Sequence, residues 1–194
     1  TETMDDVAGI VDLVKKVRAI GRRHQGKRAQ VNVSLATFVS KALTPFQWLP
    51  LIDEATLETK QELLRRGLRG PGISFSWHDP RTTLLEAAVS RGDRRLGQVI
   101  HRAWQLGAKF DAWDELFDEG LWWQAFAEAG LDPNFYARRE RPLDEVFPWD
   151  HIDVGLRKEF LIEEYQRSLR GETTIDCRRA CMDCGVSEAF GCCF

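Results

Sequence analysis

The cysteines of this chain gather in its last eighteen residues. Cys177, Cys181 and Cys184 are separated by three and then two residues, and Cys192 and Cys193 follow closely. Thiolates at such spacing can converge on one metal centre, and a fourth sulfur can complete a four-sulfur shell. We therefore predict a metal site formed by Cys177, Cys181, Cys184 and Cys192, with Cys193 as a substitute fourth ligand.

All-thiolate ligation suits both zinc and an iron–sulfur cluster, and the spacing does not separate the two. Structural disulfides are one alternative, and a reversible thiol switch among Cys177, Cys181 and Cys184 is another. An odd number of cysteines in so short a segment favours a metal over disulfides. A metal-bound thiolate cluster predicts a reducing compartment, and we expect a cytoplasmic protein.

Composition limits the other classes of function. The 194 residues are 43% hydrophobic, enough for one domain or a domain with an appendage. The net charge of -3 gives no general attraction to nucleic acid or to an anionic membrane. No apolar stretch approaches the ~20 residues that span a bilayer, so we expect no membrane partner.

The first elements to position any site are a helix and a strand. Thr3 and Asp6 predict a helix cap, followed by valines and isoleucines at helical spacing up to Gly21 or Gly26. The β-branched stretch 30–38 then predicts a buried strand. A second short candidate, 73–77, is not expected to complete a parallel sheet with it.

From Asp53 onward the pattern is almost entirely helical. Most expected helices start at capping residues, and several stop at glycines. Three have both bounds within the chain pattern: Asp53 to about Arg66, Asp93 to Gly107, and 122–129. Two more start at a Thr83/Glu86 capping box and at Asp132-Pro133, and the last covers 154–170. The predicted fold is mostly α with a remnant α/β element, divided into segments 1–50, 51–171 and a cysteine-rich tail, 172–194.

A second set of reactive side chains lies at Asp150, His151 and Asp153. Histidine transfers protons near neutral pH, and neighbouring carboxylates could raise its pKa. The structural interpretation is that Asp153 caps the helix expected from Val154 and that His151 is an ordinary hydrogen-bonded residue. The tripeptide Arg91-Gly92-Asp93 is explained by a turn and a helix cap rather than by adhesion.

Several motifs together resemble one protein family. Residues 33–48 look like the last strand and following loop of a radical S-adenosylmethionine barrel, and 91–97, 110–113, 148–155 and the tail from Asp176 resemble the C-terminal section of one subgroup. That subgroup carries an N-terminal cobalamin-binding-like domain. The tail shares its C-x3-C-x2-C spacing with the catalytic motif of such enzymes. However, it follows a long helix, and Asp183 replaces the usual aromatic residue, so we expect a second, C-terminal site.

The resemblance implies that segment 1–50 is the end of a partial (β/α) barrel. Residues 1–3 look like the end of the loop after the fifth strand, so the cysteines of the catalytic 4Fe-4S cluster would lie upstream and this chain would be a fragment. Backbone at Phe38 and Val39 would then lie near S-adenosylmethionine, as cofactor-binding residues. Side chains of Lys41, Thr44 and Gln47 could reach substrate or cofactor. The alternative is that Phe38, Phe46 and Trp48 anchor the core while Lys41 is solvated.

The chain departs from the family pattern at two places. Ser40, Ala42 and Leu43 replace two prolines and a histidine of the loop, which predicts a less rigid loop. Ser187 stands where the family tends to have a further cysteine, which leaves the fourth ligand open between Cys192 and Cys193.

The resemblance implies an enzyme that cleaves S-adenosylmethionine to a 5'-deoxyadenosyl radical acting on an unknown substrate, a small molecule or RNA. Its cofactors would include a catalytic 4Fe-4S cluster and the tail metal, with cobalamin as a further candidate, and its partner would be the upstream part of the same protein. The rival hypothesis is a non-catalytic helical module whose zinc-binding tail docks a protein or RNA.

Overall fold

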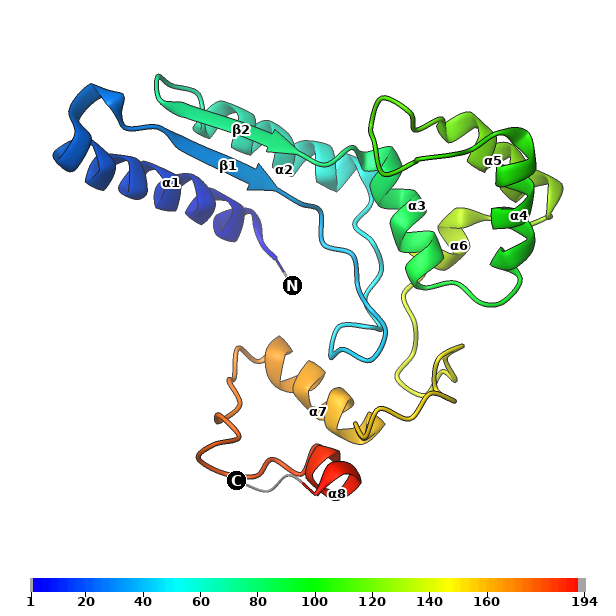
Figure 1. The fold of residues 1–194 in the computed structure, drawn as a ribbon. Helices are drawn as coiled ribbons and strands as arrows, with labels where there is room; N and C mark the ends of the chain where they lie inside the picture. Colours follow the sequence, from blue (N-terminus) through cyan, green and yellow to red (C-terminus); the bar gives the residue numbers. More distant parts are fainter. Residues whose placement is uncertain (1, 192–194) are drawn as a thin grey trace. The chain divides into compact units, whose positions relative to one another are not determined.

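The computed structural model describes residues 2–191 and is mostly helical, as predicted (Figure 1). The described elements, in chain order, are α1 (Met4–Gln25), the 3-10 turn η1 (Gly26–Arg28), β1 (Val31–Leu35), α2 (Glu54–Gly67), β2 (Ile73–Trp77), α3 (Pro80–Ser90), α4 (Leu96–Leu106), α5 (Glu119–Glu128), α6 (Pro133–Ala137), α7 (Lys158–Leu169) and α8 (Val186–Phe190).

The chain packs into two compact units, each made of two separate stretches of the sequence. Unit 1 comprises the residues up to Phe38 together with Ile52–Thr83, and unit 2 comprises Val39–Leu51 together with the residues from Leu84 onward. The three predicted segments, 1–50, 51–171 and 172–194, stay a prediction about domains.

The start of α1 confirms the predicted cap. The Thr3 hydroxyl accepts a hydrogen bond from the Asp6 backbone N–H at 3.2 Å, and the Asp6 carboxylate accepts one from the Thr3 N–H at 2.8 Å. This reciprocal pair satisfies two donors that the first helical turn leaves free. The helix ends at Gln25, and the Gly26 that follows it has φ +60°.

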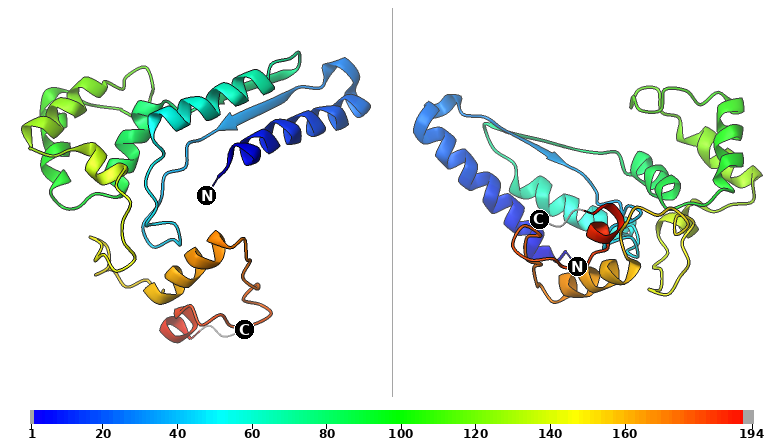
Figure 2. Two further views of the ribbon diagram at one scale, coloured as in Figure 1. Left: turned by 180° about the vertical axis from the view of Figure 1, so that it is seen from behind. Right: turned by 60° about the horizontal axis from the view of Figure 1, so that its bottom comes forward.

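The prediction that 73–77 could not complete a parallel sheet is wrong. β1 and β2 pair in parallel, with Val31 opposite Ile73 and Leu35 opposite Trp77. Asp53, whose carboxylate accepts from the Thr56 N–H at 2.9 Å, starts α2 as predicted. A helix between two parallel strands is the crossover that such pairing needs. Unit 1 therefore contains a β1–α2–β2 unit with α1 beside it (Figure 1 and Figure 2).

The two faces of this sheet differ in chemistry. Apolar side chains at alternate positions of both strands pack against α1 and α2; they include Val31, Val33, Leu35, Ile73 and Phe75. The intervening positions are polar and exposed, namely Asn32, Ser34, Ser74 and Ser76. Asn32 and Ser74 face each other across the strands in a side-chain hydrogen bond of 2.5 Å. One face of the sheet is thus covered by helices, and the other is polar.

Unit 2 has two hydrophobic clusters. The larger cluster joins α3, α4, α5 and α6 around buried residues such as Val99, Phe126 and Ala137. The smaller cluster surrounds Trp48, Phe147, Trp149 and Leu161. Trp48 is therefore a core anchor, as the structural alternative held.

Four predicted helix starts are wrong. The helix expected from Asp93 begins at Leu96, after the cap residue Arg95. Thr83 does not cap α3, because its hydroxyl donates to the Asp79 carbonyl oxygen inside a helix that begins at Pro80. The helix expected over 122–129 begins at Glu119, where the Asp118 carboxylate accepts from the Gly120 N–H. The last long helix begins at Lys158 instead of Val154.

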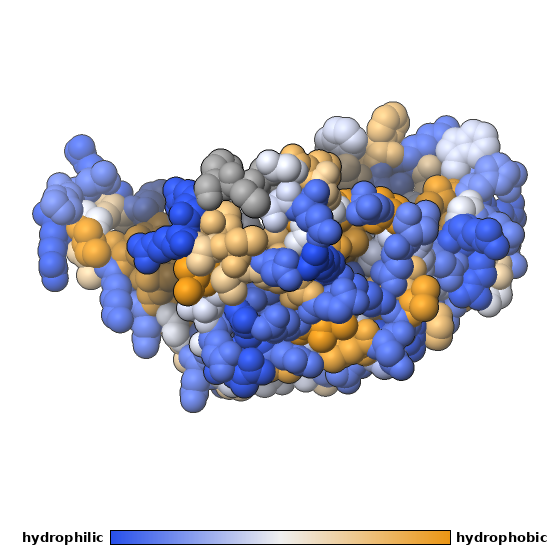
Figure 3. Space-filling view, turned by 90° about the horizontal axis from the view of Figure 1, so that it is seen from below, coloured by the Kyte–Doolittle hydropathy of each residue, from blue (hydrophilic) through white to orange (hydrophobic). Residues whose placement is uncertain are grey.

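No helix among residues 2–191 is long and apolar enough to cross a membrane. On the face shown in Figure 3, hydrophobic residues appear as patches separated by hydrophilic ones.

Candidate functional site

The cysteine-rich tail is held against the segment that precedes α7. The Arg157 N–H donates to the Cys184 carbonyl oxygen at 2.9 Å. The Arg157 guanidinium also pairs with Asp183 at 2.8 Å and with Glu188 of α8. Arg157 therefore binds the tail in two ways, through a backbone hydrogen bond and through ion pairs with two acidic side chains.

Two glycines allow the tail and the segment before α7 to approach each other closely. Gly185 has φ +99°, and a Cβ there would lie 2.5 Å from the Gly155 carbonyl oxygen. Gly155 has φ +74°, and a Cβ there would lie 2.8 Å from Ala189 and 2.7 Å from Phe190. Side chains at either position would both strain the backbone and collide with the opposite segment.

The predicted metal ligands do not form a ligand cluster in the described chain. Cys177 and Cys181 are exposed, Cys184 is half-buried, and all three are free thiols. Within residues 2–191, no group of three or more His, Cys, Asp or Glu side chains is arranged to hold a metal ion. Cys192 and Cys193 lie outside the described residues. A metal held by these cysteines would require the tail to change conformation.

Position 187 lies beside one of the cysteines. The Cys181 Sγ atom is 3.9 Å from the Ser187 Oγ atom. The residue that departs from the family pattern is thus spatially next to the motif, although Ser187 belongs to α8 and follows the last cysteine of the trio. A cysteine at 187 would place a second sulfur near Cys181.

The two predicted cofactor-binding residues differ in exposure. Phe38 is 56% exposed, whereas Val39 is buried within the larger cluster of unit 2. They follow β1 by three and four residues. The Val39 side chain is enclosed by the core and is not available to a ligand. Their contact with a cofactor stays a prediction.

The polar side chains of the 39–51 loop hold the loop together. Lys41 forms an ion pair with Glu86 at 2.5 Å, and the Thr44 hydroxyl donates to the Lys41 carbonyl oxygen at 2.8 Å. Gln47 is buried, and its Oε1 atom accepts from the Leu43 N–H at 3.0 Å and from the indole N–H of Trp149 at 2.8 Å. Each of these residues therefore has a structural role in the loop.

Arg91 is a buried residue that the sequence reasoning missed. It is 1% exposed, and its Nε donates to the Tyr136 carbonyl oxygen at 3.0 Å. Its Nη1 donates to the Ser40 hydroxyl at 2.8 Å and to the Leu49 carbonyl oxygen, and its Nη2 donates to the Arg139 carbonyl oxygen at 2.8 Å. One guanidinium thus joins the 39–51 loop to the segment around α6. No local signal could identify this role, because most of the acceptors are backbone carbonyls.

The charge around Arg91 is mainly positive. Burial, together with the nearby charges of Arg141 and Arg139, lowers the pKa of Arg91 to about 10. The Arg139 guanidinium forms two hydrogen bonds of 2.7 Å with Glu145, which holds the pKa of that carboxyl below its usual range. Arg91 remains protonated at neutral pH, with Glu145 as the carboxylate that offsets this cluster.

We expect acidification to destabilise the chain through Glu145. Because its folded pKa is lowered, its contribution is complete above the ordinary value of 4.5 and is lost as pH falls through the folded value. Glu145→Gln should cost about 1–2 kcal/mol at pH 7 and show a smaller further loss below pH 4.5. Urea unfolding at pH 7, 4.5 and 3 measures this. Parallel losses in the two proteins over the whole range would contradict the role of Glu145.

The Asp150, His151 and Asp153 group is not arranged for proton transfer. Asp150 accepts from the Phe147 N–H at 3.0 Å and pairs with Lys158 at 2.7 Å. Asp153 accepts from the Gly155 N–H at 2.8 Å rather than capping α7, so that predicted cap is wrong. His151 is exposed. Both carboxylates have structural partners, although Asp153 closes a turn instead of capping a helix.

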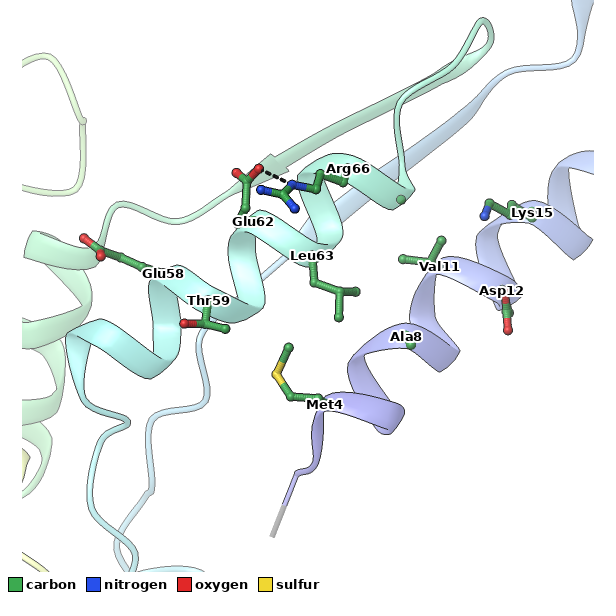
Figure 4. Close-up of a pocket in the computed structure, with 11 residues that line it drawn as sticks. Met4, Ala8, Val11, Asp12, Lys15, Glu58, Thr59, Glu62, Leu63 and Arg66 are labelled. Carbon is green, nitrogen blue, oxygen red and sulfur yellow. Dashed lines mark hydrogen bonds and ion pairs between the residues drawn. The ribbon is translucent and has the colours of Figure 1, made fainter.

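Unit 1 has a groove between α1 and α2 (Figure 4). It has a volume of about 920 Å³, and Met4, Val11 and Leu63 lie at its apolar part. Glu62 on its rim is paired with Arg66 at 2.6 Å. Ligand pockets usually combine apolar walls with convergent polar groups, and this groove lies on the helical side of the sheet, away from the polar strand face. It is therefore a weaker candidate than the tail.

Comparison with known proteins found no matching family model, no matching curated protein and no matching solved structure.

Proposed function

We propose that this chain is the C-terminal part of a cytoplasmic radical S-adenosylmethionine enzyme. The intact enzyme would use an upstream 4Fe-4S cluster to cleave S-adenosylmethionine to a 5'-deoxyadenosyl radical, which acts on a small-molecule or RNA substrate. Cobalamin would be a further cofactor of the upstream part, which is the partner of this chain.

The observation that carries the proposal is the β1–α2–β2 unit. Its parallel strands have helices on one face and Asn32, Ser34, Ser74 and Ser76 on the other. Parallel sheets normally have both faces covered or are closed into barrels. A polar strand face supports a barrel interior that surrounds a polar cofactor, and it argues against a second layer of helices over that face.

The tail would supply an auxiliary metal site in this proposal. Three thiols follow a long helix, and the tail that carries them is docked through Arg157 and Gly185. The described arrangement is not a completed ligand set, so the proposal includes a rearrangement of the tail on metal binding.

Metal and acid-labile sulfide analysis of the chain purified without oxygen tests this site. We expect iron and sulfide in stoichiometric amounts, with a broad visible absorption, and near-complete loss of both in a Cys177→Ala, Cys181→Ala, Cys184→Ala variant. Stoichiometric zinc without sulfide would instead support the helical module with a zinc-binding tail. Absence of any bound metal would contradict both metal proposals.

Single variants identify the fourth ligand. If Cys192 is that ligand, Cys192→Ala should lower the metal content while the matched Cys193→Ala should not. Adding Ser187→Cys to the Cys192→Ala chain should restore metal, because position 187 lies beside Cys181. Loss of metal in Cys193→Ala but not in Cys192→Ala would exclude Cys192 as the fourth ligand, and full metal content in both would show that either cysteine can serve.

A further inference from the structure

A loop connects α4 to α5 (Figure 1). Three of its large apolar side chains are exposed to solvent. Phe110, Trp113 and Leu116 are 66%, 55% and 52% exposed. They recur every three residues, while the adjacent Phe117 packs against the larger cluster of unit 2. Exposed aromatic side chains grouped in one short segment commonly mark an interaction surface. We call residues 110–118 the aromatic loop.

The aromatic loop is held in place by its own backbone. The Trp113 N–H donates to the Phe110 carbonyl oxygen at 3.0 Å, and the Leu116 N–H donates to the Trp113 carbonyl oxygen at 2.9 Å. Phe110 has φ +60°, a left-handed conformation that is unfavourable for an aromatic residue. The Phe110 and Trp113 rings contact edge to face, with centroids 5.9 Å apart. The two rings are thus fixed together at the surface despite local strain.

Acidic residues dominate the aromatic loop. Residues 110–118 contain four carboxylates and no lysine or arginine, and Lys109 directly precedes them. Asp114 and Glu115 are exposed, and neither forms an ion pair within the described part of the chain. The Oδ1 atom of Asp111 is shielded from solvent and accepts no hydrogen bond there. Since that oxygen is not accessible from solvent, the carboxylates available to a cationic partner are the exposed ones of Asp114 and Glu115.

We propose that the aromatic loop is a docking surface for a basic protein segment that carries apolar side chains between its lysines or arginines. The apolar side chains would cover Phe110, Trp113 and Leu116, and the cations would lie against Asp114 and Glu115. Arginine and lysine also interact favourably with aromatic ring faces. Nucleic acid would be repelled by the same carboxylates. This docking goes beyond the proposed radical enzyme and does not depend on it.

Isothermal titration of the full chain with a helical peptide built of leucine and lysine tests the surface. We expect saturable 1:1 binding. The affinity should be at least ~10-fold lower for two double variants, one carrying Phe110→Ser with Trp113→Ser and the other carrying Asp114→Lys with Glu115→Lys. Val146→Ser is the matched control, because Val146 is also exposed in unit 2 but lies outside the loop. It should bind like the original chain.

Two further titrations separate docking from general charge attraction. A leucine–glutamate peptide of the same length should not bind, and polylysine should bind at least ~10-fold more weakly than the leucine–lysine peptide. Equal affinity for polylysine, or binding that survives loss of Phe110 and Trp113, would overturn the proposal. Absence of binding would also overturn it, as would self-association of the chain through the loop. Circular dichroism of each variant confirms that a lost affinity does not reflect unfolding.

Discussion

Replacing Arg91 with methionine should lower the free energy of unfolding by about 3–5 kcal/mol. The substitution removes hydrogen bonds to Ser40, Leu49, Tyr136 and Arg139 and leaves buried acceptors without donors. Arg91→Lys should recover only a small part of the loss, because one ammonium cannot reproduce the planar fork of a guanidinium. Urea unfolding followed by tryptophan fluorescence measures both variants.

Arg95 provides the control for this prediction. It lies four residues away and pairs with Asp93 at 2.7 Å, but its side chain is 57% exposed. Arg95→Met should therefore change the unfolding free energy by no more than about 1 kcal/mol. Similar losses for Arg91→Met and Arg95→Met would show that burial of Arg91 is not the source of its effect.

Gly185→Ala should release the cysteine-rich tail from the segment before α7. Its Cβ would lie 2.5 Å from the Gly155 carbonyl oxygen, and an alanine at φ +99° adds backbone strain of about 1–2 kcal/mol. The protection of the Arg157 amide, which donates to Cys184, should fall by about 10- to 100-fold in hydrogen exchange. Exchange in α4 should not change.

Gly171→Ala is the control that separates the effect of backbone strain from the effect of a steric clash. Gly171 also has a left-handed φ, +70°, but no atom lies within 4 Å of the position of its Cβ. It should lose some local stability at the end of α7 while the Arg157 amide stays protected. If both alanine variants expose that amide equally, backbone strain alone controls the tail.

Features that depend on neighbouring residues could be predicted from the sequence. Thr3, Asp53 and Asp132 cap their helices through hydrogen bonds within two or three residues, and such short-range signals are visible in the sequence itself. Thr83 failed as a cap because Asp79-Pro80 offers an earlier start with proline at the first helical position. Asp153 failed because its carboxylate closes a turn on Gly155.

Features that depend on distant segments could not be predicted in the same way. The pairing of Val31 with Ile73 requires the α2 crossover, and neither short strand contains a signal for its partner. Arg91 resembles a solvated turn residue until the carbonyl groups of Leu49, Tyr136 and Arg139 surround it. The cysteine motif was visible from its spacing alone, whereas the contact between Cys181 and Ser187 depends on how the tail folds back.

The stretches that form the two units alternate along the sequence, which limits how this chain can be divided. Val39–Leu51 belongs to unit 2, although it precedes the Ile52–Thr83 stretch of unit 1. A truncated protein beginning at Leu84 would lack Trp48 from the smaller cluster and the Ser40 and Leu49 oxygens that Arg91 binds. Conversely, a protein ending at Phe38 would lose α2 and β2. Neither unit can be expressed alone as one uninterrupted piece of the chain without deleting or replacing an internal stretch.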